Sequence, residues 1–322
     1  MDRLYSFILP AYKASFFKEA IDSILAQTYT KFELVIVNDA SPEDLESILK
    51  SYDDSRIRYY ENKENIGGKN LVLQWNNCLK YANGEYVILA SDDDVYSPLY
   101  LEKMNELVEK YPEVNVLRPR IRTIDSDNNT RHIYGYLKER VGMPEFFYSW
   151  MTGHIGSAIS YYMIKKDALL NHGGFVNFPL AWGSDDATIL LLSQYGVAFA
   201  QDILFSFRQS GVNISSRRND SLILKNKLSA YLEFFSWLNR FITNFTSAEN
   251  DEDEFYITYI NKNLPSYFRC VTLLVLSAST PKAILCNVRL IKRLKVISVK
   301  DYLITLFHSF VKTLRRSLNL NY

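Results

Sequence analysis

Three consecutive aspartates follow an apolar stretch near residue 90, and this junction constrains the fold more than any other feature. Residues 85–90 read Glu-Tyr-Val-Ile-Leu-Ala, the composition of a buried strand, because Tyr, Val and Ile suit a packed pleated surface. Asp92, Asp93 and Asp94 come directly after it. Three adjacent carboxylates repel one another, and a divalent cation with oxygen ligands offsets them most simply. Ligands of open α/β sheets bind at the carboxyl ends of strands, so the triplet predicts a metal site there.

Strand-like and helix-like segments alternate through the first hundred residues. Strands are expected at 4–9, 33–37, 57–60 and 85–90, and helices at 17–29, from Ser41 and from Asn65 to about Tyr81. Strands interleaved with helices of this length predict an α/β fold with a doubly wound, mostly parallel sheet.

The later chain changes character. Strands are expected at 114–124, 131–137 and 157–163, a helix is expected at 185–195, and the last hundred residues have a helical pattern. With a soft boundary near Arg217, the sequence predicts a first domain over 1–216 and a helical C-terminal region over 217–322.

The composition is that of a globular protein, with 48% hydrophobic and 23% charged residues in 322. The three cysteines are far apart and odd in number, so the sequence signals neither a disulfide framework nor a zinc cluster. A first strand so close to the start leaves no room for a signal peptide, and no apolar run is long enough to span a bilayer. We therefore expect a cytoplasmic protein, with contact at the inner membrane face as an option.

The basic residues are concentrated at the C-terminus. Residues 282–322 contain nine Lys or Arg and one acid, a charge of +8 in a chain of net +1, so residues 1–281 carry −7. Apolar residues at helical spacing accompany them, which suits an anionic membrane surface. A helical lid packed on the acidic body explains the pattern equally well. A nucleic-acid partner is not expected, because no recognition motif accompanies the tail.

Four segments in order carry a family resemblance. Residues 7–12 (Phe-Ile-Leu-Pro-Ala-Tyr), 35–41 (Val-Ile-Val-Asn-Asp-Ala-Ser) and 84–94 resemble the opening of the family 2 glycosyltransferases, which have the A-type fold. Residues 171–175 followed by 183–186 are similar to that family's acceptor segment. The resemblance covers roughly residues 3–215 and implies inverting transfer of a sugar from a nucleotide-diphosphate donor, UDP-linked by expectation.

The resemblance also implies a nucleotide site. Asp39 would accept a hydrogen bond from a uracil N–H, while Pro10 and Tyr12 would form the wall beside the base. Lys69, after Gly67-Gly68 at an expected helix start, could offer an ammonium to a phosphate. The alternatives are a turn residue for Asp39 and a plain loop at Lys69.

At the acidic triplet, Mg²⁺ or Mn²⁺ would bridge Asp92, Asp93 and Asp94 to the diphosphate, which also makes them nucleotide contacts. The family pattern is Asp-x-Asp-Asp with a proline four residues later. Aligned on Pro98, Ser91 takes the place of the first acid, so the identity of the ligating carboxylate stays open. An acidic cap for the following helix is the alternative.

For the general base, the resemblance implies Asp186, with Asp185 beside it, at a helix start after a glycine-containing loop. An N-terminal helix cap is the alternative. Downstream, Arg208 matches a phosphate-neutralising arginine, although Ser210 stands where the family often has a histidine.

Together these features predict an inverting, metal-dependent glycosyltransferase acting on a saccharide or lipid-linked acceptor in surface glycan synthesis. A nucleotidyltransferase is less expected, because no Gly-rich basic loop follows the first strand. A catalytically silent protein that binds sugar nucleotides or glycans is the non-enzymatic alternative.

Overall fold

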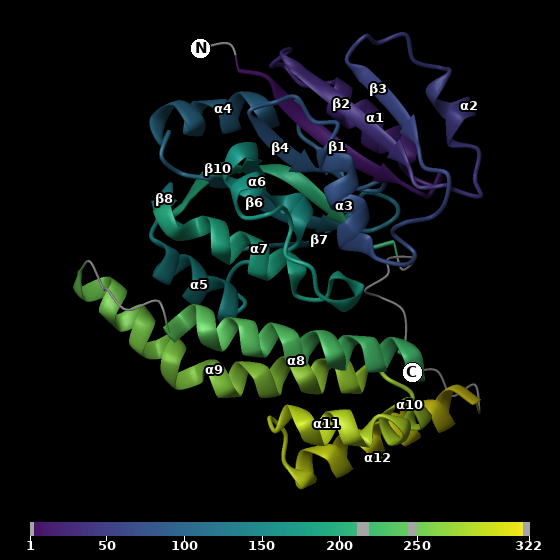
Figure 1. Ribbon diagram of the computed structural model, residues 1–322, viewed down its shortest axis with the longest axis vertical. Helices are drawn as coiled ribbons and strands as arrows, with labels where there is room; N and C mark the ends of the chain where they lie inside the picture. Colours follow the sequence, from purple (N-terminus) through teal and green to yellow (C-terminus); the bar gives the residue numbers. More distant parts are fainter. Residues whose placement is uncertain (1–2, 211–218, 244–249, 318–322) are drawn as a thin grey trace. The chain divides into compact units, whose positions relative to one another are not determined.

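A computed structural model describes residues 3–210, 219–243 and 250–317 (Figure 1). The chain divides into two compact units, Met1–Asn177 with Ser184–Ser210 and Phe178–Gly183 with Gly211–Tyr322. The boundary expected near Arg217 lies outside the described residues, so the division at 216 and 217 remains a prediction.

The first unit contains a ten-stranded mixed sheet that is mostly parallel, as the sequence predicted. Its order is β3-β2-β1-β4-β9-β6-β10-β5, with β7 paired to β6 and β8 to β10. The strands are β1 (Tyr5–Ala11), β2 (Phe32–Asn38), β3 (Ile57–Glu61), β4 (Tyr86–Leu89), β5 (Val95–Tyr96), β6 (Val116–Ile124), β7 (Thr130–Ile133), β8 (Arg140–Val141), β9 (Met163–Lys165) and β10 (Val197–Arg208). The four strands β3, β2, β1 and β4 are parallel neighbours.

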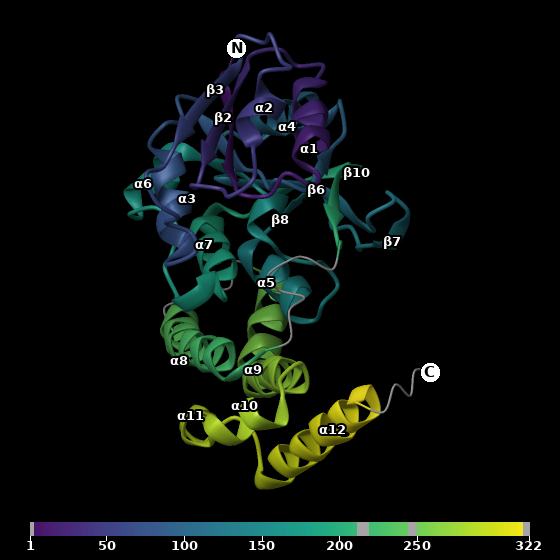
Figure 2. The same ribbon diagram turned by 90° about the vertical axis from the view of Figure 1, so that its right-hand side faces the viewer.

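Helices cover both faces of this sheet. They are α1 (Phe17–Leu25), α2 (Leu45–Leu49), α3 (Leu71–Leu79), α4 (Tyr100–Lys110), α5 (Met143–Met151), α6 (Lys166–Asn171) and α7 (Ser184–Leu192). Figure 2 shows α1 and α4 on one face and α3 and α6 on the other. Chain order reverses between β1 and β4, and such a switch point opens a crevice at the carboxyl edge of a doubly wound sheet.

Three local expectations were wrong. The helix expected from Asn65 begins only at Leu71, where the Asn70 side chain caps α3. Residues 157–163 do not form one strand, since a 3-10 turn, η1 (Ile159–Tyr161), precedes β9. The helix expected from Ser41 begins instead at Leu45, where the Asp44 carboxylate accepts from the Ser47 amide. The Ser41 hydroxyl donates to the Tyr12 carbonyl at 2.6 Å, and its oxygen accepts from the Glu43 amide at 3.0 Å, so Ser41 holds the turn before the helix while Asp44 caps α2.

The second unit is helical, in agreement with the pattern of the last hundred residues. It contains a 3-10 turn, η2 (Pro179–Ala181), and the helices α8 (Ser221–Thr243), α9 (Asp251–Ser277), α10 (Pro281–Cys286), α11 (Val288–Leu294) and α12 (Val299–Ser317). Phe235 of α8 stacks on Phe268 of α9 with ring centroids 3.9 Å apart, which joins the two longest helices. In the part of the chain that the structure describes, no helix combines the length and apolarity needed to cross a bilayer.

Candidate active site

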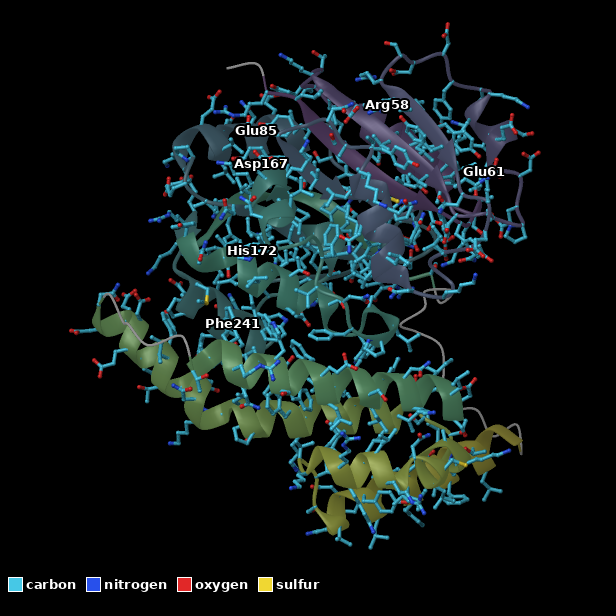
Figure 3. The ribbon with its side chains drawn as sticks, in the orientation of Figure 1. Arg58, Glu61, Glu85, Asp167, His172 and Phe241 are labelled. Atoms are coloured by element: carbon cyan, nitrogen blue, oxygen red, sulfur yellow. The ribbon has the colours of Figure 1, made fainter. Side chains whose placement is uncertain are left out.

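The carboxyl ends of the parallel strands place several predicted residues at one edge of the sheet. Glu61 marks that edge at the end of β3, and Glu85 precedes β4 at the opposite edge (Figure 3). Tyr12 follows β1, Asp39 follows β2, and the acidic triplet follows β4. The sheet therefore gathers segments that lie up to eighty residues apart in the sequence.

Asp92 fastens the loops after β1 and β4 to each other. Its Oδ2 accepts hydrogen bonds from the backbone amides of Tyr12 (3.1 Å) and Lys13 (2.8 Å). Burial raises the pKa of Asp92, and the two amides oppose that rise. The ring of Tyr12 is 40% exposed, so it is accessible as the predicted wall for a base, with Pro10 two residues before it on β1.

Asp39 holds the loop that leads into α3. The buried carboxylate accepts from the Asn62 side-chain amide (2.8 Å) and from the backbone amides of Ile66 (2.8 Å) and Gly67 (2.7 Å). A Cβ added at Gly67 would lie 2.8 Å from Asp39 Oδ2, so a side chain here would push the loop away. A carboxylate has about four lone-pair sites, which leaves capacity for one further donor. The uracil contact of Asp39 stays a prediction.

Asp93 and Asp94 are both buried and follow each other in the turn after β4. The Ser91 hydroxyl donates to Asp93. Asp94 accepts from the backbone amide of Arg208 (2.9 Å) and from the Ser160 hydroxyl (3.2 Å). Burial, with the adjacent Asp93 charge, raises the pKa of Asp94 well above its usual range. The turn therefore concentrates negative charge in a place where water screens it poorly.

Arg208 supports this turn from β10. Its buried guanidinium donates from Nε to the Asp93 carbonyl (2.8 Å) and from Nη1 to the Asp125 carbonyl (3.1 Å). It also pairs with Glu19 at 2.9 Å and lies 4.2 Å from the Phe16 ring centroid. These contacts give Arg208 a holding role, and its direct contact with phosphate stays a prediction.

The three carboxylates of the triplet do not converge on one point. Among the described residues, no group of three or more His, Cys, Asp or Glu side chains has the arrangement of a metal centre. Asp92 is directed at backbone amides, whereas Asp93 and Asp94 are adjacent buried carboxylates in one turn. That pair fits a magnesium-like ion, which commonly takes one or two protein carboxylates and completes its shell with phosphate and water oxygens.

Asp185 and Asp186 open α7 but have different partners. Backbone amides of this same turn donate to the Asp185 carboxylate, as expected of an acid at a helix start. The Ser157 hydroxyl and the Trp150 side chain donate to Asp186. Burial raises the pKa of Asp185 to about 6, and burial together with the Asp185 charge raises that of Asp186 well above its usual range.

A line of hydrogen bonds leads from a buried arginine to Asp186. Arg118 Nη1 donates to the Tyr162 hydroxyl (3.2 Å) and to the Gly156 carbonyl (2.9 Å). The Tyr162 hydroxyl donates to Ser157 Oγ (3.3 Å), and Ser157 donates to Asp186. Nothing in the sequence indicated this line of hydrogen bonds, because Arg118, Tyr162 and Ser157 belong to no local acidic motif.

The segment 157–160 connects the predicted base to the acidic turn. Ser157 contacts Asp186 and Ser160 contacts Asp94. Three residues of chain span at most about 10 Å, so the two acidic groups share one region of the first unit.

The predicted phosphate ligand Lys69 is exposed. Its ammonium pairs with Glu64 at 2.5 Å, and its phosphate contact stays a prediction.

Comparison with known proteins gives relatives for part of the chain. An uncharacterized glycosyltransferase of Rickettsia typhi is 39% identical over 115 residues, which is 35% of each chain. One of Methanocaldococcus jannaschii is 28% identical over 176 residues, 52% of this chain and 59% of its own. The match thus spans about a third of the Rickettsia relative and less than two thirds of the other.

Solved structures share the fold. A TarS fragment of S. aureus in complex with UDP-GlcNAc superposes with a TM-score of 0.61 at 15% identity, covering 97% of this chain and 92% of its own. The mannosyltransferase PcManGT of Pyrobaculum calidifontis in complex with GDP-Man and Mn²⁺ gives 0.52 at 18% identity, covering 97% and 87%. At these identities the likeness shows the fold alone.

The sequence profile described as glycosyl transferase family 2 matches residues 6–173, more than half of the chain. That range contains the crevice between β1 and β4, the acidic turn and the loop that positions Asp186. The chain belongs to glycosyl transferase family 2.

Proposed function

We propose that this glycosyltransferase moves a sugar from a UDP-linked donor to a hydroxyl of a saccharide or lipid-linked acceptor, with inversion, in surface glycan synthesis. The observation that carries the proposal is the segment 157–160, which ties Asp186 to the acidic turn at the switch point of the sheet. The solved complexes of TarS with UDP-GlcNAc and of PcManGT with GDP-Man support a nucleotide-diphosphate donor.

The residues at the crevice would divide the work of donor binding. Tyr12 and Pro10 would flank the base, and Asp39 would accept from it through its remaining lone pair. Asp93 and Asp94 would hold Mg²⁺ or Mn²⁺, and such an ion, when bound, neutralises the charge of the departing diphosphate. Arg208 keeps the turn that carries both aspartates in place.

Asp186 would act as general base. As the acceptor oxygen attacks the anomeric carbon, the bond from that carbon to the phosphate oxygen breaks and the hydroxyl proton passes to the Asp186 carboxylate. Attack from the face opposite the leaving group inverts the configuration. Ser157 and Trp150 fix the carboxylate, and its raised pKa makes it a stronger base than an ordinary aspartate.

The test is release of nucleotide from a panel of UDP- and GDP-sugars, with and without saccharide and lipid-linked acceptors. We expect acceptor-dependent release of UDP, a fall of about 10²–10⁴-fold in D186N, and unchanged UDP binding by calorimetry. The matched control is D127N, which removes an exposed acid. Full activity in D186N would show that Asp186 is not the general base. Release of pyrophosphate would indicate a nucleotidyltransferase. If no nucleotide or pyrophosphate is released, the protein would be a binding protein.

A further inference from the structure

Helix α12 exposes a row of large apolar side chains, while Tyr302, Leu306 and Val311 are half-buried. The exposed fractions are 76% for Val299, 56% for Leu303, 65% for Phe307, 50% for Phe310 and 60% for Leu314. These positions follow one another at steps of four, four, three and four, so they form one stripe along the helix, named here the α12 stripe.

The polar side of α12 makes the contacts with the rest of its unit. Asp301 pairs with Arg269 of α9 at 2.5 Å, and the buried Ser309 hydroxyl donates to the Ser279 carbonyl at 2.7 Å. Thr305, between them on this side, is buried as well. A helix packed as a lid would place its apolar face against the protein and leave the polar face to solvent. The observed arrangement is the reverse.

Exposed positive charge accompanies the stripe. All eight Lys and Arg residues in 282–315 are exposed: Lys282, Arg289, Lys292, Arg293, Lys295, Lys300, Lys312 and Arg315. Asp301 is the only acid in this range, and Arg269 already neutralises it. Helices α10, α11 and α12, which carry these cations, lie together at one end of the second unit (Figure 2).

We propose that α12 lies in the plane of an anionic bilayer surface, with the stripe among the acyl chains and the basic side chains against lipid phosphates. An apolar face beside Lys and Arg is the pattern of an interfacial helix, and each cation near such a surface contributes about 1 kcal/mol. A second copy of the chain is a poorer occupant, because two such surfaces would bring like charges together.

The probe is sedimentation of the full chain with phosphatidylcholine vesicles that do or do not contain phosphatidylglycerol. We expect binding to the phosphatidylglycerol vesicles and at least about tenfold weaker partitioning to phosphatidylcholine alone, because several cations act together. F307E should weaken binding about tenfold or more, because it places a charge in the acyl region. The matched control is L222E, which adds the same charge at a 64% exposed leucine of α8 and should bind normally.

A second variant keeps the proposal testable if F307E does not fold. K292E on α11 combined with K300E, which borders the stripe, leaves the stripe intact and should reduce binding to the anionic vesicles by at least about tenfold. Equal binding of F307E and the unaltered chain, each with the same circular dichroism melting curve, overturns the proposal. If F307E does not fold, unchanged binding of the double lysine variant overturns it instead.

Two further outcomes identify other occupants. If the chain dimerises without lipid in a concentration-dependent way, and F307E abolishes that dimerisation, the stripe would be the contact surface for a second copy. Absence of both dimerisation and vesicle binding would assign it to packing within the chain. The assay contains neither sugar donor nor acceptor, so its result is independent of whether the proposed transfer activity is found.

Discussion

At the scale of single residues, the Tyr162 hydroxyl is the link that can be removed with least change in shape. Y162F deletes the hydrogen bond to Ser157, and Ser157 then holds the Asp186 carboxylate less firmly. Because that bond favours the charged form, its weakening should raise the pKa of Asp186 and move the acidic limb of the pH–rate profile to higher pH.

We expect Y162F to lower kcat by about tenfold at neutral pH while the KM for the donor stays unchanged. The pH–rate profile separates this positioning role from a purely structural one, which would lower kcat at every pH alike. Y195F is the control, since Tyr195 is 54% exposed. If the acidic limb of the profile lies at the same pH in Y162F and in the unaltered enzyme, Tyr162 does not act on Asp186 through Ser157.

The acidic pair should also make the protein more stable at low pH. Burial raises the pKa of Asp185 from 3.8 to about 6, which corresponds to roughly 3 kcal/mol. A raised folded-state pKa gives stability that is present below the ordinary value near 3.8 and is lost as the pH rises through about 6.

D185N removes that charge, so its melting temperature should exceed that of the unaltered protein at pH 8, and the difference should shrink toward pH 4. Thermal unfolding followed by circular dichroism at both pH values measures it, with D127N showing no such trend. If the two proteins differ in melting temperature by the same amount at pH 8 and at pH 4, ionisation of Asp185 does not destabilise the folded state.

Sequence reasoning found the acids at this scale but not the groups that hold them. Asp92 and Asp186 were predictable because each follows an expected strand or opens an expected helix. Ser157 precedes Asp186 by 29 residues, and Trp150, on α5, precedes it by 36. A lone serine or tryptophan so far away carries no local signal of this contact. Their role depends on how the loops fold back over the sheet.

At the scale of elements, the loop between β3 and α3 depends on Asp39. In D39N one carboxylate oxygen becomes an amide nitrogen that faces the donors of Asn62, Ile66 or Gly67. We expect a loss of about 1–3 kcal/mol in the free energy of unfolding, because buried donors are left unsatisfied. UDP affinity should fall as well, since the loop borders the crevice.

Urea denaturation and calorimetry with UDP measure the two effects of D39N. The control D53N alters an exposed acid that precedes β3 and should change stability by less than about 0.5 kcal/mol. An unchanged midpoint for D39N would mean that the loop is held by something other than this carboxylate.

The elements themselves show which sequence signals were sufficient. Apolar runs followed by polar turns predicted β1, β2 and β4, because a strand buried in a parallel sheet is apolar on both faces. The wrong strand at 157–163 and the wrong helix start at Ser41 share one cause. In both places serine hydroxyls bond to distant groups, which no local propensity can register.

At the scale of the whole molecule, the segregation of charge was predictable from the sequence, but the side on which each C-terminal helix packs was not. A tail of +8 with interleaved apolar residues was compatible with a lid or a membrane surface. The choice depends on which side of α12 meets α9 and α10, and helical spacing alone does not fix that side. The described contacts are polar on α12, and the apolar stripe is exposed.

The response of the whole chain to nucleotide and metal follows from the buried pair Asp93 and Asp94. UDP alone adds further negative charge beside these two buried carboxylates, whereas UDP with Mn²⁺ brings a cation that both carboxylates and phosphates attract. Ligand at a hundred times its Kd adds about 2.7 kcal/mol to the free energy of unfolding.

We therefore expect UDP to raise the melting temperature by a few degrees with Mn²⁺ and by much less with EDTA. D93N should abolish the difference between the two conditions, and D202N, which alters an exposed acid on β10, should retain it. An equal rise with Mn²⁺ and with EDTA would mean that the pair is balanced within the protein and that donor binding needs no cation.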